Sequence, residues 1–130
     1  AELVTQHYYP KHVLHKPLEE WPEFLNRAFS HLNPAIYIYM QGYSEFGVTG
    51  NATLKGWDVS SRLNELKIPT LMIGGTYDTM NPKYMEWMST EVQNGRSLTT
   101  ESAHISQYDD PEAYFSGLIK FIKDVNNDNF

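Results

Sequence analysis

The segment Thr70-Leu71-Met72-Ile73-Gly74-Gly75-Thr76-Tyr77-Asp78 decides the fold class of this chain. It is a short apolar run that opens after Pro69 and ends in two glycines, a pattern typical of a buried strand. Asn81-Pro82 follows, and an asparagine N-cap with a proline in the first turn starts a helix. We therefore predict a strand that leads into a helix, with Asp78 in the loop at the carboxyl end of the strand.

A second strand and helix follow in the same order. A weaker strand is predicted over residues 96–100, and after a loop through His104 a final helix begins at Asp110-Pro111, with apolar residues at helical spacing. Strands that alternate with helices are typical of an α/β fold with a parallel sheet. Two strands are too few for such a sheet, so the chain is predicted to lack the centre of its own fold.

The upstream residues have a different character. An amphipathic helix is predicted over residues 18–33, and a second, short helix over residues 34–40. Residues 42–56 carry four glycines and no sustained apolar period, which indicates a surface loop. We therefore divide the chain into a first part, residues 1–56, and a second part, residues 57–130.

The composition argues against several classes of partner and site. The 130 residues include 16 acidic and 10 basic side chains, and the net charge of -6 disfavours binding to nucleic acid or to an anionic membrane. Cysteine is absent, which excludes thiolate metal sites and is compatible with the reducing cytoplasm. No apolar run approaches the roughly 18 residues of a membrane span. We predict a cytoplasmic protein with no metal, no cofactor, and no nucleic-acid or membrane partner.

Asp78 and His104 follow neighbouring strands, at the ends where α/β proteins gather catalytic groups. A buried carboxylate that binds one ring nitrogen of a histidine leaves the other nitrogen free to take a proton from a serine. An Asp followed by a His also matches the α/β-hydrolase order of serine, acid and histidine. The alternative is structural: Asp78 caps the turn before the next helix, and His104 is an ordinary loop residue.

The sequence contains no nucleophile for such a triad. A nucleophile elbow needs Gly-x-Ser-x-Gly at a strand-to-helix turn, and Gly42-Tyr43-Ser44-Glu45-Phe46 comes nearest but lacks the second glycine. A metal site at His7, His12 and His15 is disfavoured, because no cysteine or closely spaced carboxylate accompanies them. The chemistry predicted for this chain is therefore an acid and a base without a nucleophile.

The sequence resembles the prolyl aminopeptidases (proline iminopeptidases) of the α/β-hydrolase superfamily, especially the smaller type similar to the archaeal tricorn-interacting factor. The resemblance covers nearly the whole chain and concerns the C-terminal half of that family. It is carried by nine segments: Tyr9-Pro10-Lys11-His12-Val13, the stretch from Leu32-Asn33-Pro34 through Gly42-Tyr43-Ser44-Glu45-Phe46, Val48-Thr49-Gly50-Asn51, Trp57-Asp58, Ile68-Pro69-Thr70-Leu71, Gly74-Gly75-Thr76-Tyr77-Asp78, Met85-Glu86-Trp87-Met88, Asn94-Gly95-Arg96 and Asp110-Pro111-Glu112-Ala113-Tyr114-Phe115.

The resemblance implies the C-terminal part of an α/β-hydrolase fold, with the last parallel strands and their flanking helices, plus part of a helical cap. Residues 1–56 would be the later part of the cap, and residues 57–130 the C-terminal part of the core domain. The implied activity is that of a serine aminopeptidase, which releases an N-terminal residue, commonly proline, from small peptides through an acyl-enzyme.

The resemblance also implies roles for four residues. Asp78 and His104 would be the acid and base of the triad. Glu45 falls on the cap glutamate that anchors the free α-ammonium group of the substrate, and Tyr37 falls on a cap tyrosine that lines the same pocket. Thr79 departs from the pattern, because the family often has a second acidic residue directly after the triad Asp.

Other departures concern the rest of the active site. Tyr43 replaces a usual proline and Ala103 a usual glycine, and the elbow and the Gly-rich oxyanion loop are absent from this sequence. The chain alone is therefore expected to be inactive. Its expected partners are a small peptide substrate with a free N-terminus and the N-terminal half of the hydrolase, which would carry the Ser nucleophile.

Two other functions stay open at this point. One is an amidase or esterase of the same fold that acts on amino-acid amides or esters, since the triad chemistry is the same and only the pocket differs. The other is a non-catalytic binding fragment, because half of a parallel sheet exposes an unpaired edge and an apolar face that a partner can cover.

Overall fold

The computed structural model describes residues 2–44 and 46–129, and the chain forms two compact units. The first unit combines the residues up to Glu20 with those from Ser60 onward, and the second unit is Trp21–Val59. Among the described residues, no helix has both the length and the apolar character that a membrane span requires. The division of the complete fold into cap and core at residue 56 stays a prediction.

The first unit is built on two parallel strands. Strand β1 (Thr70–Gly75) pairs with strand β2 (Gly95–Thr100), and their first residues lie opposite one another, as do their last. The register therefore brings the carboxyl ends of both strands to the same level of the sheet. Both strands were predicted from the sequence, and the α/β class is confirmed.

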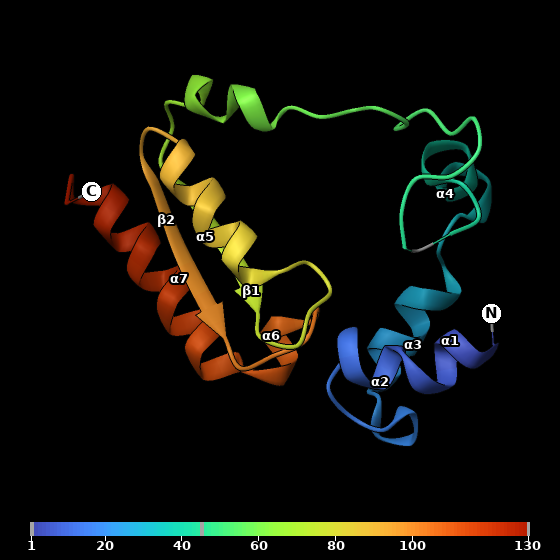
Figure 1. The fold of residues 1–130 in the computed structure, drawn as a ribbon. Coiled ribbons are helices and arrows are strands. Elements are labelled where there is room, and N and C mark those ends of the chain that lie inside the picture. Colours follow the sequence, from blue (N-terminus) through green and yellow to red (C-terminus); the bar gives the residue numbers. More distant parts are fainter. Residues whose placement is uncertain (1, 45, 130) are drawn as a thin grey trace. The chain divides into compact units, whose positions relative to one another are not determined.

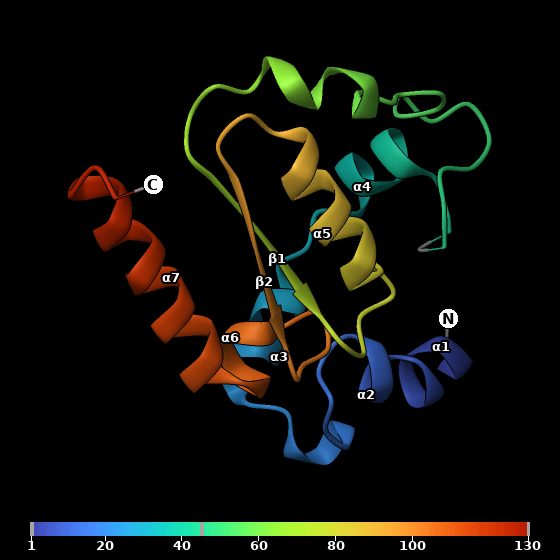
Figure 2. The ribbon, with the colours of Figure 1, turned by 60° about the vertical axis from the view of Figure 1, so that its left-hand side comes forward.

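Two longer helices cover the strand pair. Helix α5 (Pro82–Glu91) packs against both strands and helix α7 (Pro111–Asn126) contacts β2, and the two helices flank the pair on opposite sides (Figure 1 and Figure 2). Asn81 and Asp110 cap these helices, since each side chain accepts a hydrogen bond from a backbone N–H in the first turn. Both helices begin where the sequence predicted them, at Asn81-Pro82 and Asp110-Pro111.

Several short helices complete the first unit. Helix α6 (Ser106–Asp109) replaces part of the loop that was predicted between His104 and Asp110, and its residue Ser106 is buried. The short helices are α1 (Glu2–His7), α2 (Tyr9–His12), η1 (Leu18–Glu20), η2 (Ser60–Glu65) and α6 (Ser106–Asp109).

The second unit contains helices α3 (Glu23–Ser30) and α4 (Pro34–Gln41), followed by turns. The helix predicted over residues 18–33 is shorter than expected, because Pro22 is extended (φ -67°, ψ 148°) and separates α3 from the upstream turn. Helix α4 agrees with the prediction. Gly42 ends it with a φ of 95°, a conformation that favours glycine.

An ion-pair network joins the last helix to β2. The Asp124 carboxylate accepts hydrogen bonds from Lys120, one turn earlier on α7, and from Arg96 on β2. These two cations lower the pKa of Asp124, with the hydrogen bond from Lys120 as the larger cause. The network fixes α7 along the strand pair.

We expect Asp124→Asn to lower the melting temperature at pH 7, because the neutral amide loses both ion pairs. A carboxyl whose pKa is depressed on folding contributes stability above its unfolded pKa of about 3.9 and loses that contribution as the pH falls through its folded pKa. The difference from the wild type should therefore shrink as the solution is acidified. Thermal unfolding followed by circular dichroism, with Glu91→Gln as an exposed control, measures it. A difference that stays constant with pH would contradict the role of the charge.

Candidate active site

Asp78 lies in a tight loop directly after β1. Backbone hydrogen bonds tie this loop to the end of β2: Thr76 N donates to Thr100 O (3.0 Å) and Tyr77 N donates to Ser102 O (2.9 Å). The Asp78 side chain is only 9% exposed. The carboxylate is thus held by the strand end in a partly dry position.

His104 lies in the corresponding loop after β2, and the two side chains meet. The Nδ1 atom of His104 lies 2.9 Å from Oδ2 of Asp78. A carboxylate oxygen can only accept, so Nδ1 carries the proton and Nε2 of the neutral ring carries a free lone pair. The His104 side chain is 48% exposed, so Nε2 is accessible to a proton donor. This is the geometry of a general base oriented by an acid.

The structural alternative for Asp78 holds at the same time. Its other oxygen, Oδ1, accepts a hydrogen bond from Met80 N at 3.0 Å, which shapes the turn before α5. One carboxylate oxygen therefore fixes the loop while the other binds the imidazole. The two interpretations of Asp78 in the sequence do not exclude each other, and the catalytic role stays a prediction.

The two loops approach each other because the strand ends are packed closely. A Cβ atom on Gly75 would lie 2.4 Å from Ser102 O and 2.5 Å from Ala103 O, so only glycine leaves enough room. Beneath this contact, the hydroxyl groups of Thr100, Ser102 and Ser106 form a buried chain with separations of 2.7 and 2.8 Å. These buried hydroxyl groups find their hydrogen-bond partners within the protein, and they make the loop that carries His104 more rigid.

Two carboxylates near the site hold the backbone of the His104 loop. Asp109 accepts hydrogen bonds from Ala103 N (2.9 Å) and from His15 N, and Asp110 accepts one from Glu101 N (3.1 Å). From the sequence, Asp110 was predicted to begin the final helix and belongs to one of the segments that resemble the family, and Asp109 was not singled out. The pair of acids directly before Pro111 was the available signal, but their backbone partners lie too far along the chain to be inferred from it.

The Tyr77 side chain is held beside the same loops. Its hydroxyl donates to Glu101 Oε2 (3.2 Å), and Thr76 Oγ1 donates to the other oxygen of that carboxylate (3.3 Å). The hydrogen bond to Glu101 and its negative charge raise the pKa of Tyr77, because ionisation would place two negative charges side by side. The Tyr77 phenol therefore stays protonated and acts as a donor.

One of the two predicted substrate-binding residues, Tyr37, lies in the second unit. Tyr37 lines an apolar pocket of about 350 Å³ together with Ile36, Met40 and Leu54, and its side chain is partly exposed. Glu45 lies outside the described residues. Both roles therefore stay predictions. In the part of the chain that the structure describes, no group of three His, Cys, Asp or Glu residues is arranged to hold a metal ion.

Comparison with known proteins identifies the relatives of this chain. Proline iminopeptidases from Chitinophaga pinensis and Elizabethkingia meningoseptica are both 46% identical to it, over 98% and 100% of its length. A proline iminopeptidase from Flavobacterium johnsoniae is 47% identical over 98% of the chain. The chain is similar to the C-terminal half of proline iminopeptidases. The predicted resemblance is thus confirmed. The chain spans 42 to 43% of the length of these relatives, and no family model matches it.

Solved structures support the same fold. A proline iminopeptidase from Mycobacterium smegmatis matches 99% of this chain and 46% of its own length, with a TM-score of 0.80 and 23% identity. The crystal structure of VinJ matches 90% of this chain and 39% of its own length, with a TM-score of 0.77 and 26% identity. The fold is that of the C-terminal part of an α/β-hydrolase, as predicted.

We expect Gly75→Ala to separate the acid from the base. The added methyl group would collide with the backbone carbonyls of Ser102 and Ala103, so the loops must move apart. In a crystal structure of the variant, the distance from His104 Nδ1 to Asp78 Oδ2 should exceed the hydrogen-bonding limit of about 3.2 Å. An unchanged distance would show that the close packing at Gly75 does not determine how near the acid lies to the base.

Gly50→Ala is the matched control for this experiment. An alanine Cβ at Gly50 meets open space, so the only cost is the positive φ of 62°, about 1–2 kcal/mol. The control should leave the Asp78–His104 hydrogen bond intact.

Proposed function

We propose that this chain is the C-terminal segment of a serine aminopeptidase that releases N-terminal proline or other residues from small peptides. The observation that carries the proposal is the hydrogen bond between Asp78 and His104 at the ends of two adjacent parallel strands. Similarity to proline iminopeptidases over the whole chain supports the same assignment.

In this mechanism His104 is the general base and Asp78 its orienting acid. Nε2 of His104 takes the proton of the attacking serine hydroxyl while the serine oxygen bonds to the scissile carbonyl carbon. The ionised Asp78 stabilises the imidazolium that forms. His104 then returns the proton to the leaving amine, and the acyl-enzyme remains. Water attacks the acyl-enzyme in the second half of the reaction by the same acid–base exchange.

The serine must come from the N-terminal half of the hydrolase, which we propose as the partner of this chain. The sequence contains no Gly-x-Ser-x-Gly, and it spans less than half of its relatives. Helix α7 leaves Phe115, Ile119 and Ile122 about half exposed at helical spacing, an apolar face that suits packing against further elements. Within the described residues, β1 pairs with β2 alone, and its other edge can accept the remaining strands. By itself the chain should be inactive.

Glu45 and Tyr37 are the proposed contacts to the substrate. A carboxylate in a partly dry pocket binds an ammonium group through charge-assisted hydrogen bonds, which suits Glu45 for the free N-terminus. The apolar pocket lined by Tyr37 suits an apolar side chain or a proline ring. Thr79 is neutral at a position that is often acidic in the family. Binding of the substrate's ammonium group therefore depends more strongly on Glu45. The predicted cytoplasmic location stays a prediction.

An amidase or esterase would use the same acid–base pair. It would differ from an aminopeptidase only in that it needs no free amino group on the substrate. The non-catalytic alternative predicts that the pair is idle. Both alternatives are decided by the two experiments that follow.

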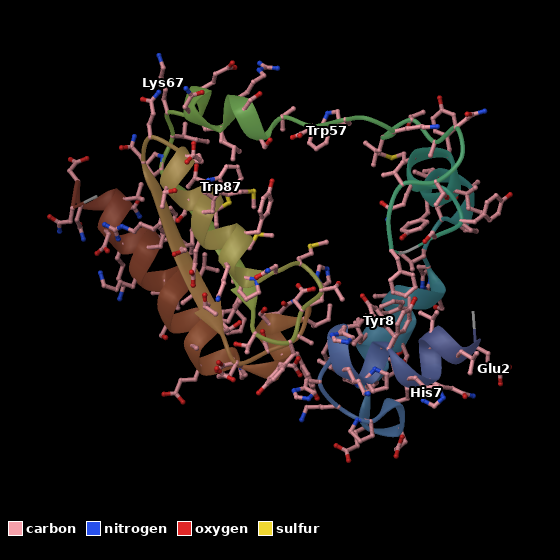
Figure 3. The ribbon with its side chains drawn as sticks, viewed as in Figure 1. Glu2, His7, Tyr8, Trp57, Lys67 and Trp87 are labelled. Atoms are coloured by element: carbon pink, nitrogen blue, oxygen red, sulfur yellow. The ribbon has the colours of Figure 1, made fainter. Side chains whose placement is uncertain are left out.

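We expect Asp78→Asn to reduce kcat of the complete hydrolase by about 10⁴-fold, and His104→Ala to reduce it by about 10⁶-fold. The assay follows the release of the chromophore from proline p-nitroanilide. His7→Ala is the control, because His7 is exposed at the end of α1 and its side chain points outward (Figure 3). If His104→Ala keeps wild-type activity, the catalytic proposal is wrong and the binding-fragment alternative stands.

Glu45→Gln should reduce kcat/KM for the same substrate by about 10- to 100-fold, since a hydrogen bond to a charged group contributes about 1.5–3 kcal/mol. The wild-type hydrolase should cleave the N-acetylated substrate poorly, because acetylation removes the ammonium charge that Glu45 would bind. Glu112→Gln, at an exposed position on α7, is the control for a change of charge alone. Equal cleavage of blocked and free substrates would favour the amidase or esterase.

A further inference from the structure

A segment near the start of the chain runs beside the loop that carries His104. His104 N donates to His12 O (3.1 Å), and Ile105 N donates to Val13 O (2.9 Å). Leu14, the next residue, is completely buried, so the segment is anchored in the core of the first unit. The backbone on which the base sits is therefore supported by residues about ninety positions upstream.

The His12 side chain reaches the other catalytic loop. Its Nδ1 atom lies 2.7 Å from Tyr77 O, the carbonyl of the residue directly before Asp78. A carbonyl oxygen can only accept, so Nδ1 of His12 carries the proton in both the neutral and the charged ring. The ring also packs against Tyr8, with 4.7 Å between the ring centroids. One residue thus holds the loop of the acid with its side chain and the loop of the base with its backbone.

We propose that His12 is a positioning residue for the acid–base pair, which it aligns by tying the Tyr77–Asp78 peptide to the backbone of His104. The inference rests on the proposed function, since it assigns His12 a part in the reaction of Asp78 and His104. His12 acts through the two loops and not on the substrate.

The role is tested by a matched pair of variants in the complete hydrolase, His12→Asn and His12→Leu. The two side chains have nearly the same shape, but only asparagine places an N–H donor where Nδ1 stands. His12→Leu should lower kcat by about 10- to 100-fold, since a small misplacement of a catalytic group costs up to about 10²-fold. KM should change by less than about twofold. His12→Asn should retain most of the activity, and His7→Ala serves as the control.

A spectroscopic readout separates positioning from folding. The proton on His104 Nδ1 should give a strongly downfield NMR resonance in the wild type and in His12→Asn, and the resonance should be weakened or lost in His12→Leu. His12→Gln serves where the leucine variant does not fold, because its amide lies one bond further out and cannot donate from the Nδ1 position. It should behave like His12→Leu in both readouts.

The outcomes separate this inference from the proposed function. If His104→Ala leaves hydrolysis intact, the proposed function fails, whatever His12 does. If His104→Ala abolishes hydrolysis while folded His12→Leu or His12→Gln keeps wild-type kcat and the downfield resonance, only the positioning role is overturned. A lower melting temperature with unchanged kcat would likewise overturn it, since that is the result of a purely structural contact.

Discussion

The close approach of the two strand ends at Gly75 is the constraint on which the site depends. Because Gly75 has no side chain, the carbonyls of Ser102 and Ala103 can pass directly over it. The loops after β1 and β2 then share backbone hydrogen bonds, and these bring Asp78 within reach of His104. The hydrogen bond between Asp78 and His104 thus depends on the absence of one methyl group at the end of a strand.

The elements that could be predicted from the sequence are those with local signals. Asn33-Pro34, Asn81-Pro82 and Asp110-Pro111 each start a helix, because a capping side chain and a proline act within one turn. Strand β1 was predicted for a similar reason, since its apolar run ends in glycines. The order of the strands and the loops that follow them was then enough to bring Asp78 and His104 together.

The features that could not be predicted depend on contacts between distant parts of the chain. Nothing near His12 in the sequence indicates that its carbonyl accepts from His104 or that its ring reaches Tyr77. The contacts of Asp109 could not be predicted either, because one of its hydrogen-bond donors is His15 N, far upstream in the sequence. The prediction of one helix over residues 18–33 was wrong for a local reason that was present in the sequence. Pro22 interrupts this helix, but the prediction gave more weight to the helical spacing of the apolar residues.

The path of the chain has a consequence for how the proposed enzyme can diversify. The segment Trp21–Val59 leaves the first unit after Glu20 and the chain rejoins it at Ser60, so this segment is an insertion between two parts of one compact body. The residues that align the acid and the base all lie in that body, while Tyr37 lies in the insertion. Under the proposed function, exchange of the inserted segment between related enzymes would alter which substrates are accepted and leave the acid–base pair unchanged. Under that proposal, selection can act on substrate range and on catalysis through separate stretches of the same gene.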